Sequence, residues 1–335
     1  MADLRAAAAA WPERVAAETP AGAAITYRAL DALADGLAAR LGAAGVGRGH
    51  RVGVVLPSSI DALAALYGTL RSGAVCVPVD PGAPPARVVS ILTDCGVAAL
   101  VAEATDGLAG SLAAALPARP LVLALPACGD GGGVRAAAGV TAGAHPAAAP
   151  AAADLALIQY TSGSTGRPKG VTLSHGNLTA ILDWYAQAAT PGPDDRFASH
   201  SPLQLSVTLF NALLPARVGA AVVLVDEAVR RSPRDLVRLV SERRVSIWMC
   251  APSVQRLLLE HGAIDPAVHR FPRLLLSGGE VLPPRQARRL RELFPGTTLR
   301  GLYASTETSG CTLYDPLAAE PAAGAPPSVG RAAVG

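Results

Sequence analysis

The sequence predicts an α/β protein with mostly parallel sheets, built as two stacked α/β subdomains. Short apolar strands without polar alternation follow one another with helical segments between them, which is typical of parallel sheets covered on both faces. A stretch rich in Ala, Gly and Pro, residues 104–153, interrupts this alternation. We therefore expect a first subdomain over residues 1–150 and a second over residues 151–335.

The first half supplies the elements of the first subdomain. Residues 1–18 are typical of an amphipathic helix and not of a signal peptide. Apolar residues at helical spacing predict a helix over 25–41, which Gly42 or Gly45 can end. The pattern then predicts, in order, strand 51–57, helix 60–73, strand 74–80, helix 85–96, strand 97–103 and strand 121–125.

The second half continues the same alternation. Residues 154–160 form an apolar run that predicts a strand leading directly into a polar motif. The remaining pattern predicts, in order, helix 176–188, strand 221–225, helix 234–243, strand 245–250, strand 273–279, helix 284–293 and strand 298–304.

Composition excludes several classes of protein. There is no uninterrupted run of about 20 bulky apolar residues, so we expect no membrane span. The net charge of +3 is small and dispersed, which argues against a nucleic-acid partner. The six histidines lack metal-ligand spacing. Five cysteines without a C-x-x-C pair indicate free thiols in a reducing cytoplasm: Cys76, Cys95, Cys128, Cys250 and Cys311.

The polar motif is YTSGSTGRPKG, residues 160–170, followed by VTLSHGNL, which we expect to begin a helix. It is not a Walker A motif, because Pro168 stands where that motif requires glycine. Its glycines allow close approach of a ligand, its hydroxyls donate hydrogen bonds, and its lysine is a cation for phosphate oxygens. The alternative is a mobile surface turn. The phosphate-binding residues are predicted to be Thr161, Ser162, Gly163, Ser164, Thr165, Gly166 and Lys169.

This motif closely resembles the phosphate loop of the adenylate-forming (AMP-binding) superfamily. Further stretches resemble other elements of that family in order and spacing: ITYRAL (25–30), LRSGAVCVPVDPGAPPARVVSILTD (70–94), VSIWMCAPS (245–253), LLLSGGEVLP (274–283) and LYASTETSG (302–310). The resemblance spans essentially the whole chain. It is strongest to the N-terminal core of a nonribosomal peptide synthetase adenylation domain.

The resemblance implies a ligase that uses ATP and Mg²⁺. A carboxylic or amino acid would become an acyl-adenylate and pass to the thiol of a carrier protein or CoA. By analogy Lys169, Thr306 and Glu307 are catalytic, with Glu307 holding Mg²⁺. Ala304 departs from the family's glycine, and its methyl group narrows the nucleotide site. The resemblance adds to the nucleotide-binding set Gly278, Gly279, Glu280, Tyr303, Ala304, Ser305 and Thr306.

The predicted acid pocket carries no charge. Ser206 stands where the family places an aspartate that pairs with an α-ammonium group, and a shift of register by three residues would put Leu203 there. A neutral side chain does not compensate a buried ammonium. We therefore expect an acid without an α-amine, or with its amine elsewhere, as in a β-amino acid. The predicted pocket residues are Ser206, Val207, Phe210, Met249, Leu276, Gly278, Leu302, Gly310 and Cys311.

Two histidines and the last residues of the sequence give further predictions. For His175, in SHGN, we favour a structural role at a helix start, and His200 is a candidate for facing the substrate. The family continues past PPSVGRAAVG with a ribose-binding aspartate and a C-terminal lid, so we expect a fragment or a natural truncation. A non-catalytic nucleotide- or partner-binding member, and an unrelated phosphate-loop NTPase, stay open as alternatives.

Overall fold

The computed structural model describes residues 2–104, 107–126, 150–162, 168–317 and 331–332. Contacts divide the chain into two compact units. The first unit comprises Met1–Thr179 with Pro202–Leu205, and the second comprises Ala180–Ser201 with Ser206–Gly335. Most of the Ala/Gly/Pro stretch that suggested a boundary near residue 150 lies outside the described residues, so that boundary stays a prediction.

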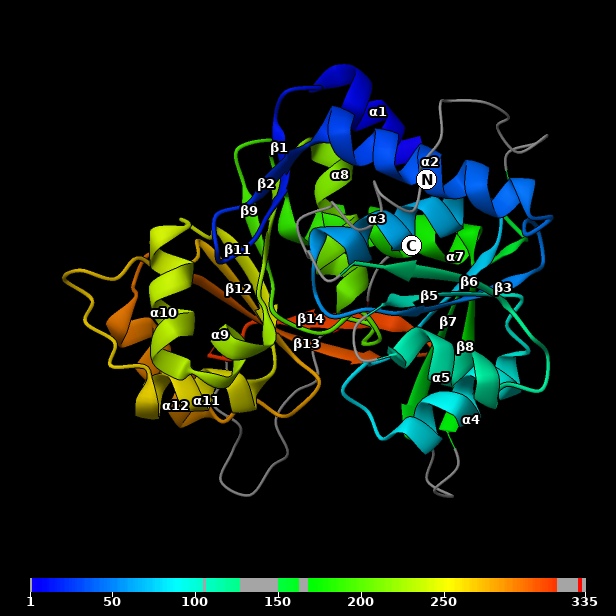
Figure 1. Ribbon diagram of the computed structural model, residues 1–335. Coiled ribbons are helices and arrows are strands. Elements are labelled where there is room, and N and C mark those ends of the chain that lie inside the picture. Colours follow the sequence, from blue (N-terminus) through cyan, green and yellow to red (C-terminus); the bar gives the residue numbers. More distant parts are fainter. Residues whose placement is uncertain (1, 105–106, 127–149, 163–167, 318–330, 333–335) are drawn as a thin grey trace. The chain divides into compact units, whose positions relative to one another are not determined.

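A mostly parallel sheet forms the centre of the first unit (Figure 1). Its strand order is β6-β5-β3-β4-β7-β8, and only the pair β7–β8 is antiparallel. The elements of this unit are α1 (Ala2–Ala10), β1 (Val15–Glu18), β2 (Ala24–Thr26), α2 (Tyr27–Ala43), β3 (Arg51–Val55), α3 (Ile60–Arg71), β4 (Val75–Pro78), α4 (Pro85–Cys95), β5 (Ala99–Glu103), α5 (Leu108–Ala115), β6 (Leu121–Leu125), β7 (Leu155–Ser162) and β8 (Pro168–Ser174).

Helix α3 is buried along its whole length. It begins at Ser59, whose hydroxyl accepts a hydrogen bond from the backbone N–H of Ala62. Small residues let α2 approach closely: a Cβ on Gly68 would lie 2.8 Å from Cβ of Leu37. At its end Arg71 forms an ion pair with Asp31 and a second with Asp35, at 2.7 Å. Both charges of α2 therefore compensate the buried guanidinium.

The second unit contains a sheet with the strand order β15-β14-β13-β12-β11-β9-β10. Strands β9 to β13 are parallel, whereas β13–β14 and β14–β15 are antiparallel. The elements are α7 (His175–Ala189), which begins in the first unit, β9 (Arg196–Ser199), a π-helix (Leu209–Leu213), α8 (Pro215–Val218), β10 (Ala221–Leu224), α9 (Glu227–Arg231), α10 (Pro233–Glu242), β11 (Ile247–Cys250), α11 (Pro252–His261), β12 (Leu274–Gly278), α12 (Pro284–Leu293), β13 (Thr298–Ser305), β14 (Ser309–Tyr314) and β15 (Arg331–Ala332).

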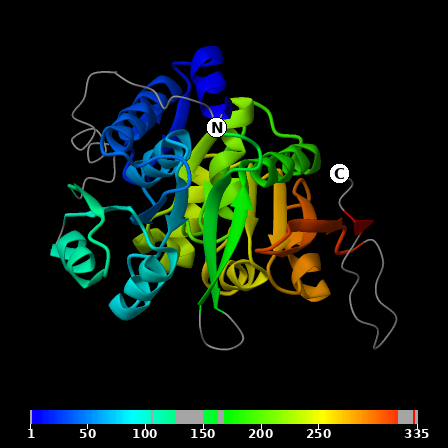
Figure 2. The same ribbon diagram turned by 90° about the vertical axis from the view of Figure 1, so that its right-hand side faces the viewer.

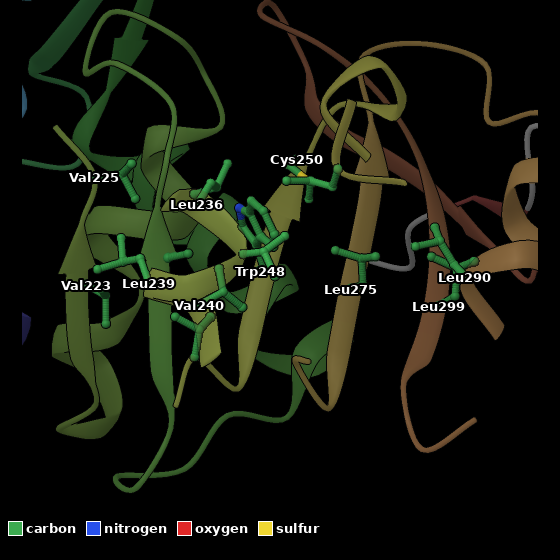
Figure 3. Close-up of a cluster of buried hydrophobic side chains, with 14 of the residues drawn as sticks. Val223, Val225, Leu236, Leu239, Val240, Trp248, Cys250, Leu275, Leu290 and Leu299 are labelled. Carbon is green, nitrogen blue, oxygen red and sulfur yellow. The ribbon is translucent and has the colours of Figure 1, made fainter. Parts of the chain in front are cut away.

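Trp248 lies at the centre of the hydrophobic core of this unit, as Figure 3 shows. Leu236, Leu239 and Val240 of α10 and Leu290 of α12 pack over one face of the sheet. Both helices are apolar on the buried side and rich in Arg and Glu on the other, which explains why their pattern was readable from the sequence.

The predicted fold class is confirmed, because the chain is α/β with two mostly parallel sheets. Strand 121–125 and helix 284–293 lie where they were predicted. Three predictions were wrong. The helix expected over residues 1–18 ends at Ala10, and Val15–Glu18 form strand β1. Residues 171–174 belong to strand β8 and not to a helix, and the stretch 104–153 contains helix α5. These errors concern short segments whose local pattern of apolar residues is weak.

Two further findings bear on the predicted class. Among the described residues, no helix combines the length and the apolar character needed to cross a membrane. The thiols of Cys76, Cys95, Cys250 and Cys311 are free, whereas Cys128 lies outside the described residues.

Candidate functional site

The phosphate-loop motif lies at the turn of a β-hairpin. Figure 2 shows its two strands, β7 and β8, as a long green pair. Thr161 pairs with Lys169, and Ser162 pairs with Pro168, so Lys169 stands at the base of the turn, where it is exposed. Gly163, Ser164, Thr165 and Gly166 lie outside the described residues.

Lys169 is the single lysine of a chain that contains 29 Lys and Arg residues. Arginine therefore fills every other basic position. A lysine ammonium is a compact point charge with three rotatable donors, whereas a guanidinium is a planar fork. The use of lysine at this one position fits a flexible contact to phosphate oxygens.

Tyr160 fixes the stem of this hairpin to helix α4. Its ring lies across the strand pair, because a Cβ on its partner Gly170 would meet the ring at 3.1 Å. Its hydroxyl donates a hydrogen bond to the carboxylate of Asp94 and lies 3.3 Å from Sγ of Cys95. Burial, and then the Asp94 hydrogen bond, raise the pKa of Tyr160 well above its ordinary value. The hydroxyl therefore stays protonated and acts as a donor at neutral pH.

The second predicted motif lies at another hairpin turn, between β13 and β14. Tyr303 is 53% exposed, and Glu307 is also exposed. The register shifts between Tyr303 and Ala304, so Cys311 is left as an extra residue on the opposite strand. Such a bulge twists the strand and redirects its side chains.

Hydrogen bonds hold the turn of this hairpin. The hydroxyls of Ser305 and Thr308 lie 2.9 Å apart, and that of Thr308 lies 2.7 Å from Sγ of Cys311. Thr306 lies within the turn and is half-buried. These contacts flank Thr306 and Glu307 and use neither of their side chains.

Glu280 follows the carboxyl end of β12. Its carboxylate accepts hydrogen bonds from the backbone N–H and the hydroxyl of Ser253, at 3.0 and 2.8 Å. Ser253 lies in the first turn of α11, where a carboxylate also interacts favourably with the helix dipole. Gly279, just before Glu280, has a φ of +89°, which only glycine adopts readily. Glu280 thus has a structural contact in addition to its predicted position beside the base.

Four of the predicted acid-pocket residues share one face of the second sheet. Met249 is paired with Leu276, and Gly278 with Leu302, in parallel register. Residues paired in this way point to the same face, as do residues two apart on one strand. Met249, Leu276 and Leu302 are buried. The alternation of the strands therefore brings these positions together.

An aromatic cluster packs around the next predicted residue, Phe210. Its ring centroid lies 5.0 Å from Tyr185 and 5.4 Å from Phe197, and Tyr185 lies 4.9 Å from Trp184. The sequence analysis missed Trp184 and Tyr185, both on α7. The sequence placed both residues in the predicted helix 176–188, but a helical pattern does not show that they contact residues 210 or 310.

Gly310 and Cys311 lie beside this cluster. A Cβ built on Gly310 would overlap with the ring of Trp184. The Cys311 thiol contributes, after burial, to raising the pKa of the Tyr185 hydroxyl. Both residues of β14 are thus adjacent to α7.

The segment that begins with Ser206 is neutral and leads through a turn into the π-helix. Ser206 and Val207 are half-buried, and their carbonyls accept hydrogen bonds from the N–H groups of Leu209 and Asn211. Asn211 is fully buried: its Nδ2 lies 3.5 Å from the carbonyl of Met249, and its Oδ1 has no partner among the described residues. None of the nine predicted pocket residues is charged.

The two candidate histidines are both largely uncharged at neutral pH. Burial lowers the pKa of His200 to about 4, and its ring lies edge-on to Trp248, with centroids 6.0 Å apart. His175 is the first residue of α7, and burial lowers its pKa too. Ser174 and Asn177 exchange hydrogen bonds around His175, which supports the structural role favoured for this residue.

The described residues contain no group of three or more His, Cys, Asp or Glu side chains that could hold a metal ion. A single exposed carboxylate such as that of Glu307 nevertheless suits Mg²⁺, which usually keeps several waters and takes phosphate oxygens as ligands. This single carboxylate therefore fits a metal that arrives with a nucleotide.

Relatives of the chain have similar sequences and folds. An L-proline--[L-prolyl-carrier protein] ligase from Pseudomonas fluorescens is 36% identical over 315 residues, which are 93% of this chain and 62% of the ligase. The structure of VinN with L-aspartate is 26% identical, with a TM-score of 0.82, over 94% of this chain and 78% of VinN. ATP-bound MatB from Rhodopseudomonas palustris is 27% identical, with a TM-score of 0.83, over 100% of this chain and 65% of MatB.

The chain spans less than two thirds of the length of the Pseudomonas ligase. A sequence model of the family described as AMP-binding enzyme matches residues 4–335, which include both hairpin motifs and all the predicted pocket residues. The chain belongs to the AMP-binding enzyme family.

Proposed function

We propose that the protein binds ATP and activates a carboxylic or amino acid as its acyl-adenylate, which then passes to a carrier-protein thiol or to CoA. One observation carries the proposal. In each of two motif-bearing hairpins the residue expected to meet the nucleotide, Lys169 in one and Glu307 in the other, is exposed at or beside the turn. The name of the Pseudomonas relative, a ligase acting on a carrier protein, supports the carrier thiol as acceptor.

The reaction requires an anion to approach a polyanion. In our proposal, Lys169 and the hydroxyls of Thr161 and Ser162, with the residues of the turn, neutralise and orient the outer phosphates. Thr306 contacts the α-phosphate, and Tyr303, half of whose surface is exposed, stacks on the base. Glu307 would hold Mg²⁺, which supplies further positive charge to the phosphates when bound.

We propose that the acid is not a standard α-amino acid. All nine predicted pocket residues are neutral, and Ser206 stands where the family has an aspartate. None of them can therefore supply a negative charge for an α-ammonium group. One relative is named as a ligase for L-proline, and VinN has a structure in complex with L-aspartate. An acid without an α-amine, or a β-amino acid, fits this chain better. The free thiols of the described cysteines fit our proposal of a cytoplasmic protein.

Carboxylate-dependent ATP–pyrophosphate exchange tests this proposal. The panel contains L-proline, L-aspartate, β-alanine, benzoate, propanoate and octanoate. Exchange with a β-amino, aryl or fatty acid but with neither α-amino acid is the expected result. Exchange with L-proline alone would overturn the inference about the acid, and no exchange with any of them would contradict adenylation. Lys169→Ala and Glu307→Ala should each reduce exchange by about a hundredfold.

The single lysine offers an independent test of ATP binding. An amine-directed reagent modifies only Lys169 and the chain's α-amino group, and mass spectrometry separates these two sites. ATP with Mg²⁺ should protect Lys169 and leave the α-amine reactive, which serves as the internal control. Equal reaction rates of Lys169 with and without ATP would remove this residue from the nucleotide site. Protection without exchange would indicate a nucleotide-binding protein that does not adenylate.

A further inference from the structure

Trp184 occupies the space beside Gly310 that a side chain at position 310 would fill. A Cβ built on Gly310 would overlap with Cζ3 of the indole and lie 2.5 Å from Cη2. The ring therefore rests directly on the backbone of β14. A glycine in a predicted pocket normally suggests added room for the ligand, but here a side chain from α7 fills that room.

The position of Trp184 also links it to a second predicted pocket residue, Phe210. Its ring lies 4.9 Å from that of Tyr185, which in turn meets Phe210 edge-on at 5.0 Å. Phe210 and Tyr185 are buried, whereas Trp184 is only half-buried. Of these three rings, Trp184 therefore presents the most surface to a ligand. An indole face suits apolar and aromatic groups.

We propose that Trp184 is a specificity-determining residue, which limits the acid to one with a compact apolar side chain lying against the indole. This inference rests on the proposed function. The pocket size is then set by Trp184 on α7 and not by Gly310 on β14. A longer acid requires the indole to leave its place on Gly310, which a well-packed aromatic cluster resists.

Exchange measurements with straight-chain acids test the size limit. The wild-type protein and Trp184→Ala are compared on propanoate, butanoate, hexanoate and octanoate, with Trp184→Phe as the conservative variant. We expect Trp184→Ala to shift the preference by about tenfold from the short acids towards the long ones, and Trp184→Phe to shift it less. An unchanged preference in Trp184→Ala overturns the inference, while exchange by the wild type still supports the proposed function.

Fluorescence provides a readout that does not depend on exchange. The chain has three tryptophans, Trp11, Trp184 and Trp248. Butanoate should change the emission of the wild type and of the control variant Trp11→Phe, and the change should be lost in Trp184→Phe. If the wild type shows no exchange, the proposed function fails, and this titration still decides the inference. No change in the wild type, or one that persists in Trp184→Phe, overturns it.

A double-mutant cycle tests the packing on which the inference depends. Gly310→Ala should lower the thermal midpoint by several degrees, because its methyl group displaces the indole. The same substitution made together with Trp184→Ala should cost much less, because the space is then empty. Equal costs in both backgrounds would show that Trp184 does not occupy the space beside Gly310, and would overturn the inference even if Trp184→Ala proves unstable alone.

Discussion

The two motif-bearing hairpins solve the same structural problem in different ways. Each attaches one antiparallel strand to the edge of parallel strands, and each places a tyrosine opposite a glycine: Tyr160 faces Gly170, and Tyr314 faces Gly301. In both pairs the ring covers the glycine. An aromatic ring over a glycine restores packing that the missing side chain would otherwise supply.

The difference lies in the hydroxyl groups. That of Tyr160 is bonded to Asp94 and lies beside Cys95 on α4, which ties the first hairpin to a helix. For the Tyr314 hydroxyl no hydrogen bond is found within the described part of the chain, and burial raises its pKa. The tyrosine of the first hairpin is therefore held by packing and a polar contact to a helix, and the tyrosine of the second hairpin by packing. Adding a methyl group at the glycine should therefore disrupt the packing of the ring. Removing the tyrosine hydroxyl should disrupt only the polar contact.

The largest expected effect is that of Gly301→Ala. Its methyl group would overlap with the ring of Tyr314, so we expect a loss of about 3 kcal/mol in the free energy of unfolding. Gly170→Ala should cost about 1 kcal/mol, because its Cβ would lie 2.9 Å from Ile158 and 3.1 Å from Tyr160. Urea denaturation measures both. Equal losses would contradict the tighter packing of the second hairpin.

A fall in pH should lower the free energy of unfolding of the second unit through His200. The folded-state pKa of His200, about 4, lies below its ordinary value of 6.5, so the unfolded chain takes up a proton that the folded chain does not. Burial is the main cause, and Arg230 adds to it. The contribution of His200, up to about 3 kcal/mol, is complete above pH 6.5 and is lost as the pH falls towards 4.

His200→Gln is the matched variant for this acid titration, because glutamine is polar and does not titrate. Unfolding free energy measured at pH 4.5 and at pH 7 should differ less in the variant than in the wild type. The remaining difference belongs to His175, whose pKa is lowered as well, and to the carboxylates. The same pH dependence in variant and wild type would remove His200 as its source.

The smallest expected effect concerns the hydrogen bond from Tyr160 to Asp94. Tyr160→Phe keeps the ring over Gly170 and removes only the hydroxyl, so it should cost about 1 kcal/mol. Tyr314→Phe should change stability by about 0.3 kcal/mol or less. Tyr160→Phe should also weaken ATP protection of Lys169, because the stem that holds Lys169 opposite Thr161 loses its tie to α4. Equal losses of unfolding free energy in the two variants would show that the hydrogen bond from Tyr160 to Asp94 does not stabilise the hairpin.

The sequence was sufficient for most of the parallel strands, although it gave no prediction for β9. Apolar runs such as residues 51–55 and 274–278 are local patterns, and their strands lie where they were expected. Strands β8 and β14 depend on antiparallel partners across a turn, and neither was predicted. Their residues alternate weakly, so only the pairing itself marks them as strands.

The site shows the same limit. Strand alternation was enough to group Met249, Leu276 and Leu302, because residues on one face recur with period two. The role of Gly310 was not readable, because its neighbour Trp184 lies more than a hundred residues earlier in the chain, on a helix. A small residue in a sequence shows only that its own side chain is absent, and the fold decides what fills the space.

Helix α3 has a consequence for local opening. Each of its residues from Ile60 to Arg71 is buried, and its guanidinium is paired with two aspartates of α2. No face of the helix meets water, so it cannot fray without exposing apolar surface and an unpaired charge at the same time. Its amide protons should therefore exchange with deuterium among the slowest of the chain, through global unfolding alone. The exchange rates of the α3 amides would then measure the free energy of unfolding of the first unit.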